Sequence, residues 1–512
     1  MSRWLILSAF LVACSPGSMQ SADDTGSGDD DGSGSGGAIG GDGCTTMDSD
    51  GDGWADEVER AMETSPTDAS DNPDSHHQRT FVMPYSAHPH PMSYDLETVS
   101  VLARADLAIL LDTTGSMAGM AAQIQPQLSA IITSLAGQVD DLAFGAAGFG
   151  DFPMYDGANS QYDVPFYLVH RVMTAHTPAG LAHIKNSFTV TNIIDGVGGS
   201  FAIMRGGDEP EQLWEALRQT AAGTGITYPS PYTGGTPIST PPFNAATAPP
   251  STALAGEEIG TIGGLGFRKD ALPIILQITD TNAHIGGDTH MTPVSATRQV
   301  ARVALKAIGA RVVGVMSYIT VGEDDLTAMA MDTGGMVPPT AWGTGSERPA
   351  GCAVGKCCTV ANDPDPLPQP DPVNGMCPLV FQSDRYSEHL AQIVSQSVVA
   401  IARGQKFQVA AELRDDPSDD VDVTQFVGSI DAIATGACSG EELTGNTFTG
   451  LVGGSPACFR ITPKANQTVM PQAEAKRYRG LVQLTGDGVG GFTQQEVWFV
   501  VPTAECTPAI VL

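Results

Sequence analysis

Basic residues are scarce in this chain, which has 25 Lys and Arg against 58 Asp and Glu and a formal net charge of −33. A nucleic-acid-binding protein must neutralise phosphates with Lys and Arg, so this balance argues against a nucleic-acid partner. A surplus of carboxylates suits a solvated exterior protein with sites for hard cations such as Ca²⁺ or Mg²⁺. The 512 residues exceed what one compact core accommodates, so we expect more than one domain.

The sequence also lacks the short motifs of common hydrolases and nucleotide-binding enzymes. It contains no H-E-x-x-H, no G-x-S-x-G and no P-loop, and its ten His are scattered. We therefore predict that the protein is not an enzyme, that it has no catalytic residues and that it takes no small-molecule substrate.

Beyond the N-terminus, no apolar run reaches the roughly 18 residues that a membrane-spanning helix needs. Residues 4–12 form a shorter apolar run after Arg3, which is typical of an export signal. This run ends in the letters LVAC, which resemble the lipobox of bacterial lipoproteins. The resemblance implies that residues 1–13 are a signal peptide and that Cys14 is acylated, so that the exported protein is lipid-anchored to the outer membrane or cell surface. The alternative is an ordinary signal peptide with a chance Cys.

An acidic segment follows the predicted anchor. Residues 14–43 are low-complexity Ser, Gly and Asp with nothing to bury, so we predict a disordered acidic linker. Residues 48–59 then match the calcium-loop pattern D-x-[DN]-x-[DN]-G-x₅-E at every specified position. The loop and its continuation, residues 44–75, resemble the single-loop calcium repeats of thrombospondin type 3.

Winding of this loop would bring its carboxylates around one Ca²⁺, and Gly53 would take a turn that a Cβ would hinder. The expected ligands are Asp48, Asp50, Asp52, the Trp54 carbonyl, Asp56 through water and Glu59. The alternative is an acidic linker that matches the pattern by accident.

Nine cysteines are present, and acylation of Cys14 would leave eight. An even number outside the cell favours disulfides. We predict that Cys438 pairs with Cys458 across a Gly-rich loop. Four further cysteines lie in one Pro- and Gly-rich stretch, where irregular spacing and the lack of a nearby His favour disulfides over a zinc site: Cys352, Cys357, Cys358 and Cys377.

From residue 104 the chain alternates apolar, strand-like runs with helical segments. The run at 106–111 suits a strand buried on both faces. This alternation predicts an α/β, Rossmann-like domain over 104–404, with a doubly wound, mostly parallel sheet. Helical segments end near residue 405, and short strands separated by turns predict a small C-terminal β-sandwich over 405–512.

Three oxygen-bearing side chains follow the first of these strands. Asp112, Thr114 and Ser116 are spaced two residues apart, which places them on one side of the turn at the carboxyl end of a strand. Ligand sites in open α/β sheets lie at such ends. Taken alone, the segment is also compatible with an ordinary turn, because Ser and Thr are common at helix N-termini.

The segment resembles the D-x-[ST]-x-S signature of the metal-ion-dependent adhesion site in von Willebrand factor type A domains, especially the A-like domain of integrin β subunits. Further pieces occur in family order: FGAAGFGD ending at Asp151, GDEPE ending at Glu211, and TDTNAH beginning at Thr279. The resemblance implies a principal metal site formed by Asp112, Thr114, Ser116, Glu211 and Asp280. It also implies a neighbouring cation site formed by Asp151, Asp208, the Pro210 carbonyl and Glu211.

One departure from the family concerns a third metal. Integrin β subunits have two acidic residues directly after the signature, whereas this chain has Ala118, Gly119 and Met120. We therefore expect that the third, regulatory metal is absent.

The resemblance implies Mg²⁺ or Mn²⁺ at the adhesion site and Ca²⁺ at the neighbouring site, whereas the loop pattern implies Ca²⁺ in the N-terminal loop. An octahedral ion with an incomplete protein shell accepts a carboxylate from a partner. We therefore predict a cell-surface lipoprotein that binds a protein or polysaccharide with an exposed carboxylate and that contacts the membrane through its anchor. The alternatives are a calcium-rigidified spacer without a ligand and, less well supported, a hydrolase. The sequence assigns no role to the long loops 223–267 and 342–377.

Overall fold

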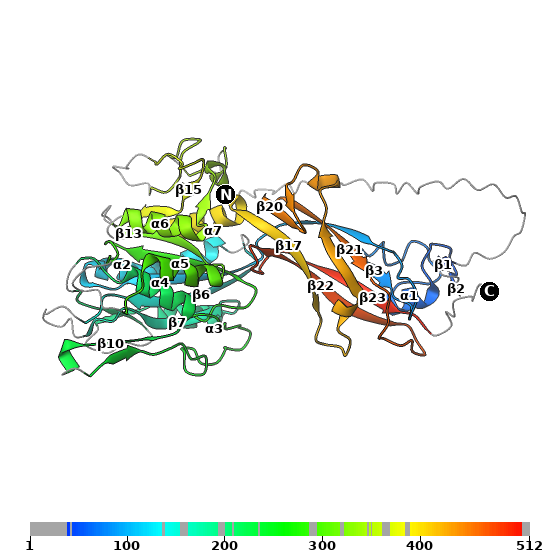
Figure 1. Ribbon diagram of the computed structural model, residues 1–512, viewed down its shortest axis with the longest axis horizontal. Helices are drawn as coiled ribbons and strands as arrows, with labels where there is room; N and C mark the ends of the chain where they lie inside the picture. Colours follow the sequence, from blue (N-terminus) through cyan, green and yellow to red (C-terminus); the bar gives the residue numbers. More distant parts are fainter. Residues whose placement is uncertain are drawn as a thin grey trace, which may run out of the picture.

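The computed structural model describes residues 38–40, 44–135, 139–153, 162–192, 200–206, 209–233, 236–285, 294–317, 322–345, 348–349, 351–360, 369–383 and 390–503. The predicted signal peptide, most of the linker, Cys14 and Asp208 lie outside the described residues. The rest forms two bodies along the long axis of the molecule, an α/β body and a β body (Figure 1). Among the described residues, no helix is long and apolar enough to cross a membrane.

The α/β body contains a six-stranded sheet. Its strand order is β16 (Val380–Ser383), β13 (Arg311–Ser317), β12 (Leu272–Thr279), β5 (Arg104–Asp112), β6 (Asp141–Phe149) and β7 (Tyr167–Thr174). Neighbouring strands are parallel except for β7, which runs antiparallel to β6. Strands β12 and β13 are buried along their whole length, because both faces of the sheet are covered by helices.

Six helices cover this sheet. On one face lie α2 (Ala118–Leu135), α3 (Pro178–Ser187) and α7 (Leu390–Gly404). On the other lie α4 (Leu213–Ala222), α5 (Arg298–Ala307) and α6 (Glu323–Thr333). Strand β5 contributes to both layers, with Leu107 and Ile109 on the first face and Ala108 and Leu110 on the second.

The β body has two further sheets. The larger has the order β19 (Leu443–Thr444), β20 (Thr447–Val452), β17 (Lys406–Asp415), β22 (Lys476–Gly486), β23 (Gln494–Val501) and β3 (Thr80–Val82). The smaller has the order β18 (Val427–Ala432), β21 (Pro456–Pro463) and β4 (Tyr94–Val99). A core that includes Phe81, Leu96, Phe426 and Phe499 joins the two sheets.

Shorter elements complete the fold. The helix α1 (Asp56–Met62) lies at the end of the β body farthest from the α/β body (Figure 1). Four pairs of short strands are separate from the main sheets: β1 (Ala38–Gly40) with β2 (Cys44–Thr46), β8 (Val190–Asn192) with β9 (Phe201–Ile203), β10 (Ile226–Tyr228) with β11 (Ile238–Thr240), and β14 (Met336–Val337) with β15 (Cys377–Pro378).

The prediction of one doubly wound, mostly parallel sheet followed by a small C-terminal sandwich is wrong. The chain forms a mixed α/β structure with several sheets, and its three larger sheets are mixed or antiparallel. The apolar runs that indicated strands do not encode strand direction, so the antiparallel β7 was not evident. The C-terminal strands also do not form a sandwich by themselves, because β3 and β4 precede the α/β body in sequence and complete both sheets of the β body.

Disulfides are present where the sequence predicted them. Cys438 pairs with Cys458 in the β body. In the α/β body, Cys352 pairs with Cys358 and Cys357 with Cys377. The disulfide interpretation of this four-cysteine cluster is therefore confirmed over the zinc interpretation.

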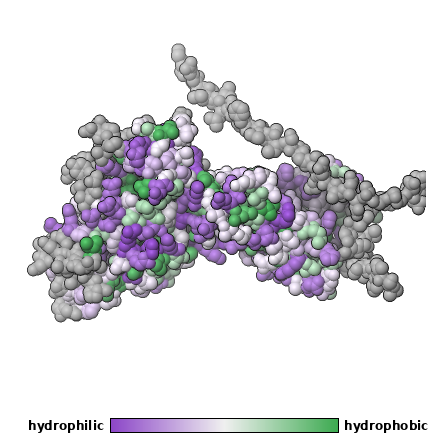
Figure 2. Space-filling model, turned by 45° about the horizontal axis from the view of Figure 1, so that its top comes forward, coloured by the Kyte–Doolittle hydropathy of each residue, from purple (hydrophilic) through white to green (hydrophobic). Residues whose placement is uncertain are grey.

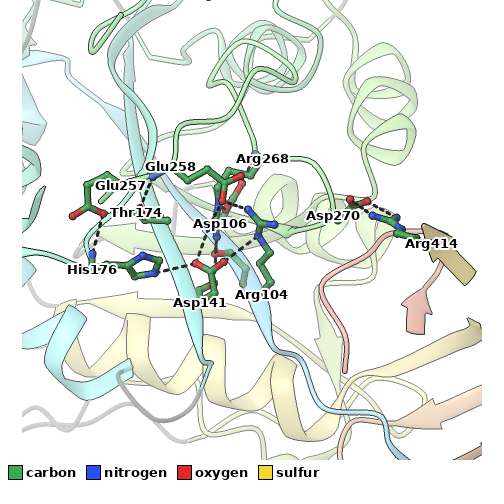
Figure 3. Close-up of polar contacts among 11 residues, drawn as sticks. Arg104, Asp106, Asp141, Thr174, His176, Glu257, Glu258, Arg268, Asp270 and Arg414 are labelled. Atoms are coloured by element: carbon green, nitrogen blue, oxygen red, sulfur yellow. Dashed lines mark hydrogen bonds and ion pairs between the residues drawn. The ribbon is translucent and has the colours of Figure 1, made fainter. Parts of the chain in front are cut away.

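A buried ion network lies at the amino-terminal end of β5, on the side of the β body (Figure 3). The Arg268 side chain is completely buried, and its Nε lies 2.7 Å from Oδ1 of the equally buried Asp106. Its Nη1 lies 2.7 Å from Oδ1 of Asp141. Burial raises the pKa of Asp106, and the Arg268 charge opposes that rise. The guanidinium thus compensates a carboxylate that the sheet withdraws from water.

The two bodies join beside this network. The backbone N–H groups of Ala103 and Arg104 donate to the Gly491 carbonyl, which lies between β22 and β23. Arg414 of β17 forms an ion pair with Asp270, as Figure 3 shows. One hydrophobic cluster continues from the α/β body into the β body, so the bodies share a core. Polar residues cover most of the face in Figure 2, and apolar residues form small patches there.

The Arg268→Met substitution should strongly destabilise the fold, because it leaves Asp106 as an uncompensated buried charge. We expect a loss of about 3 kcal/mol or more in the free energy of unfolding, measured by chemical denaturation. Arg460→Met is the matched control, since Arg460 and Asp95 form an exposed pair. That change should cost about 1 kcal/mol or less. Equal losses in the two variants would contradict a stabilising role for the buried pair.

Candidate metal centres

Asp112 ends β5 and is fully buried. Its Oδ1 accepts hydrogen bonds from the backbone N–H of Thr114 at 2.9 Å and from the Thr114 hydroxyl at 2.7 Å. Its Oδ2 accepts from the hydroxyl of Thr279, the last residue of β12, at 2.7 Å. Because β5 and β12 are parallel neighbours, their carboxyl ends meet at one edge of the sheet. Side chains from two distant sequence segments therefore converge there.

The next two sequence-predicted residues extend this chain of contacts. Thr114 Oγ1 and Ser116 Oγ are 3.4 Å apart, and Ser116 lies in the turn Gly115–Met117 that leads into α2. The Ser116 hydroxyl donates to the carboxylate of Asp280, which directly follows β12 and is half-buried. Asp112, Thr114, Ser116 and Asp280 are therefore linked in one continuous series of side-chain contacts.

Glu211 approaches from a third segment. Its backbone N–H donates to the Asn282 carbonyl at 3.0 Å, and its carbonyl accepts from the N–H of His284 at 3.0 Å. Gly206 separates its carboxylate from Thr114. A Cβ at Gly206 would lie 3.0 Å from Glu211 Oε1 and 3.1 Å from Thr114 Cβ, and the φ of this residue is +61°. Glycine thus allows Glu211 and Thr114 to lie close together.

Burial and like charge act together on these carboxyl groups. Burial raises the pKa of Asp112 to about 6, and the charge of Asp280 adds to the effect. Burial also raises the pKa of Asp280, with a smaller contribution from Glu209. A divalent cation would reverse this trend by favouring the charged forms. Carboxylate and hydroxyl oxygens are the ligands that Mg²⁺ and Mn²⁺ take, so the donor set fits such an ion.

The predicted neighbouring site is only partly described. Asp151 is buried, and its Oδ2 lies 3.1 Å from Nε2 of His284. Its Oδ1 accepts from the N–H of Phe152 at 2.7 Å. Pro210 precedes Glu211 and is half-buried, whereas the fourth predicted residue, Asp208, lies outside the described residues.

Sequence reasoning missed two acidic residues here. Asp163 is buried and accepts from the N–H of Arg205 at 3.0 Å. Burial raises its pKa to about 7, and the charge of Asp151 also raises it. It belongs to no motif, so no sequence signal marked it. Asp325, in the first turn of α6, accepts from the N–H of Ala283 at 2.8 Å and thereby holds the loop that carries Asp280.

The N-terminal calcium loop contains a second group of carboxylates. Ligand oxygens of Asp48, Asp50 and Asp52 lie within 4.8 Å of one another. Within the part of the chain that the structure describes, no other three His, Cys, Asp or Glu ligands converge as closely. The N–H groups of Gly51 and Gly53 donate to Asp48 at 2.7 and 3.1 Å. The two glycines have φ values of +77° and +99°, which residues with a Cβ rarely adopt.

Several oxygens of this loop have no hydrogen-bond donor. Glu59 is fully buried, and neither of its carboxylate oxygens has a partner. The same holds for Oδ2 of Asp50 and Oδ2 of Asp52. Burial raises the pKa of Glu59 to about 7, with further increases from the charges of Asp52 and Asp50. Buried polar atoms normally have partners, so these oxygens are free to act as ligands of a cation.

The remaining predicted loop residues have other contacts. Asp56 accepts from the N–H and hydroxyl of Ser49 at 2.8 and 2.9 Å and from Arg60 at 2.9 Å. These donors fasten the loop to α1. The Trp54 N–H donates to Asp52 at 2.8 Å, and its indole N–H donates to Asp74 at 3.3 Å.

No protein-family model matches the chain, and no curated protein matches it. Among solved structures, it is similar to proximal thread matrix protein 1 from the mussel byssus, with 12% identity, a TM-score of 0.29 and coverage of 62% of this chain and 51% of the other. The pilus adhesin SpaC from Lactobacillus rhamnosus GG has 10% identity, a TM-score of 0.28 and coverage of 81% and 46%. The human COPII-coat protein Sec24c has 9% identity, a TM-score of 0.30 and coverage of 81% and 46%. The chain spans about half the length of these structures, and the similarity assigns no family.

Proposed function

We propose that this is an exported surface protein that binds an acidic partner through a divalent cation at the carboxyl ends of β5 and β12. The observation that carries the proposal is the convergence of oxygen donors from three segments at this edge. Asp112 and Thr114 are buried, whereas Ser116 is exposed. A cation held there would be enclosed by the protein on one side and accessible to a partner on the other.

The side chains at this edge would have different roles in cation binding. Asp112, Asp280 and Glu211 supply negative charge, and the Thr114 and Ser116 hydroxyls supply neutral oxygens. Thr279 orients Asp112 through its hydrogen bond. The bound cation would supply the attraction for a carboxylate of the partner. Ile285, which is 69% exposed and follows His284, offers an apolar contact beside the site.

The position of this edge also supports the proposal. The amino-terminal end of β5 contacts the β body through Gly491, so the end with Asp112 points away from that body. The calcium loop and α1 lie at the opposite end of the molecule (Figure 1). A protein attached to a surface through its N-terminal segment would therefore present the cation site outward. The lipid anchor at Cys14 remains part of the proposal.

Asp112→Asn should weaken Mn²⁺ binding at this edge by more than about 100-fold, because it removes the most buried charged donor. Ser116→Ala should also weaken binding, whereas Ser187→Ala, which removes an α3 hydroxyl that donates to the His183 carbonyl, should have no effect. Titration calorimetry with Mn²⁺ measures the affinity of each variant.

Binding to an acidic partner is tested separately. Immobilised polyglutamate should retain the wild type in Mn²⁺, and a chelator or Asp112→Asn should abolish retention. With the 48–59 loop saturated with Ca²⁺, Mn²⁺ binding that survives both site variants would contradict the proposal, and Mn²⁺ binding without retention would favour the spacer alternative.

Asp325→Ala tests the positioning of the loop at 280–284. Asp325 is not one of the proposed ligands, but it accepts a hydrogen bond from the Ala283 N–H and thereby restrains the segment that carries Asp280. We expect Mn²⁺ affinity to fall by about 10-fold and hydrogen exchange in this loop to accelerate. Asp324→Ala is the control, since Asp324 is exposed on the same helix turn. Unchanged affinity and exchange in Asp325→Ala would exclude this role.

A further inference from the structure

Helix α1 packs against the last strand of the β body. Val58 and Met62 are buried against Val500 of β23. Trp54 and Trp498 border the same apolar cluster. The N-terminal segment is therefore held by a strand that is more than 400 residues away in sequence.

Polar contacts accompany this packing. Glu63, at the end of α1, lies 2.6 Å from Nη2 of Arg477 in β22. The same guanidinium lies over the ring of Trp498, 5.0 Å from its centroid. The backbone N–H of Thr503 donates to Glu57 at 3.1 Å. These contacts orient the helix but lie outside the loop of carboxylates.

Glu59 connects the helix to the loop. It follows Val58, which faces β23, and its carboxylate lies among the charges of Asp48, Asp50 and Asp52. In the folded protein this carboxylate has no solvent exposure and no hydrogen-bond donor. With α1 and the loop in place, a negative charge is therefore withdrawn from water and lies beside those of Asp48, Asp50 and Asp52. Such burial is unfavourable unless an opposite charge compensates it.

We propose that Ca²⁺ in the 48–59 loop is the latch that holds α1 on the β body. The cation would complete the shell of the donor-free oxygens of Asp50, Asp52 and Glu59, so that loop closure and helix docking occur together. Ca²⁺ suits this site better than Mg²⁺, because it accepts a bidentate Glu in an adaptable shell, whereas Mg²⁺ demands near-ideal octahedral geometry.

The latch would control how the N-terminal segment leaves the folded protein. With Ca²⁺ bound, α1 is packed on β23 and the N-terminal segment leaves the fold at the β1–β2 pair, at the far end of the β body (Figure 1). Without Ca²⁺, the chain is fixed to the β body only from β3 onward. The residues from β1 to β3 would then lengthen the N-terminal linker. This inference does not depend on the β5–β12 cation site, which lies at the other end of the molecule.

Hydrogen exchange of the full-length protein tests the latch. The exchange rate of the α1 amides should be at least about tenfold lower in Ca²⁺ than in a chelator. Mg²⁺ should not give this protection. Peptides from β12 should not change. Equal exchange of α1 with and without Ca²⁺ would overturn the proposal, as would calorimetry that detects no Ca²⁺ binding to the loop.

Variants separate the latch from simple helix packing. Glu59→Gln removes the buried charge and should keep α1 protected even in a chelator, with weaker Ca²⁺ binding. Glu63→Gln makes the same chemical change outside the loop and should preserve the calcium dependence. Trp498→Ala should weaken the docking of α1 and, because docking and binding are linked, should weaken Ca²⁺ binding to the loop as well. If Glu59→Gln instead exposes α1 under both conditions, Glu59 does not link docking to the cation. Asp112→Asn should behave as wild type in this assay.

Discussion

Strand β5 pairs in parallel with both β12 and β6, in a register that brings Asp112 opposite Phe149 and Leu111 opposite Ile278. Each partner strand ends within two residues of an aspartate, Asp280 after β12 and Asp151 after β6. Three aspartates from distant sequence positions consequently share one edge of the sheet. The proposed cation site, its hydrogen bonds and its outward position all depend on this register, because a shift of one residue would turn Asp112 to the opposite face.

Carboxylates are abundant in this protein, and the fold compensates the buried ones in different ways. Asp106 has the guanidinium of Arg268, whereas Asp112 has hydroxyl and amide donors. Glu257 accepts hydrogen bonds from Thr174, His176 and Thr177, which lie between the end of β7 and the start of α3 (Figure 3). These donors lower the pKa of Glu257 although the side chain is partly buried. Glu59 has no donor. With only 25 basic residues in the chain, metal ions are a physically reasonable source of the missing positive charge.

The sequence predicted those parts of the structure that depend on residues close together in the chain. The loop carboxylates from Asp48 to Asp52 converge because neighbouring backbone N–H groups bind their side chains, and Asp112 lies where a buried strand ends. The Cys438–Cys458 pair followed from a Gly-rich loop. Asp163 and Asp325 contact the site through tertiary packing, which no spacing encodes. The direction of β7 and the contribution of β3 and β4 to the β body were likewise decided by long-range pairing.

The pairing of β3 with β23 and of β4 with β21 has a consequence for how the protein acquires its structure. Asp95 and Arg460 are 365 positions apart, and they form an ion pair across two adjacent strands. The β body can therefore complete its sheets only after the whole α/β body has been synthesised. Contacts of such long sequence separation slow folding. Until they form, β21 and β23 present unpaired edges, which are sites for pairing with other chains. Assembly of this protein is thus most vulnerable to aggregation at its final step.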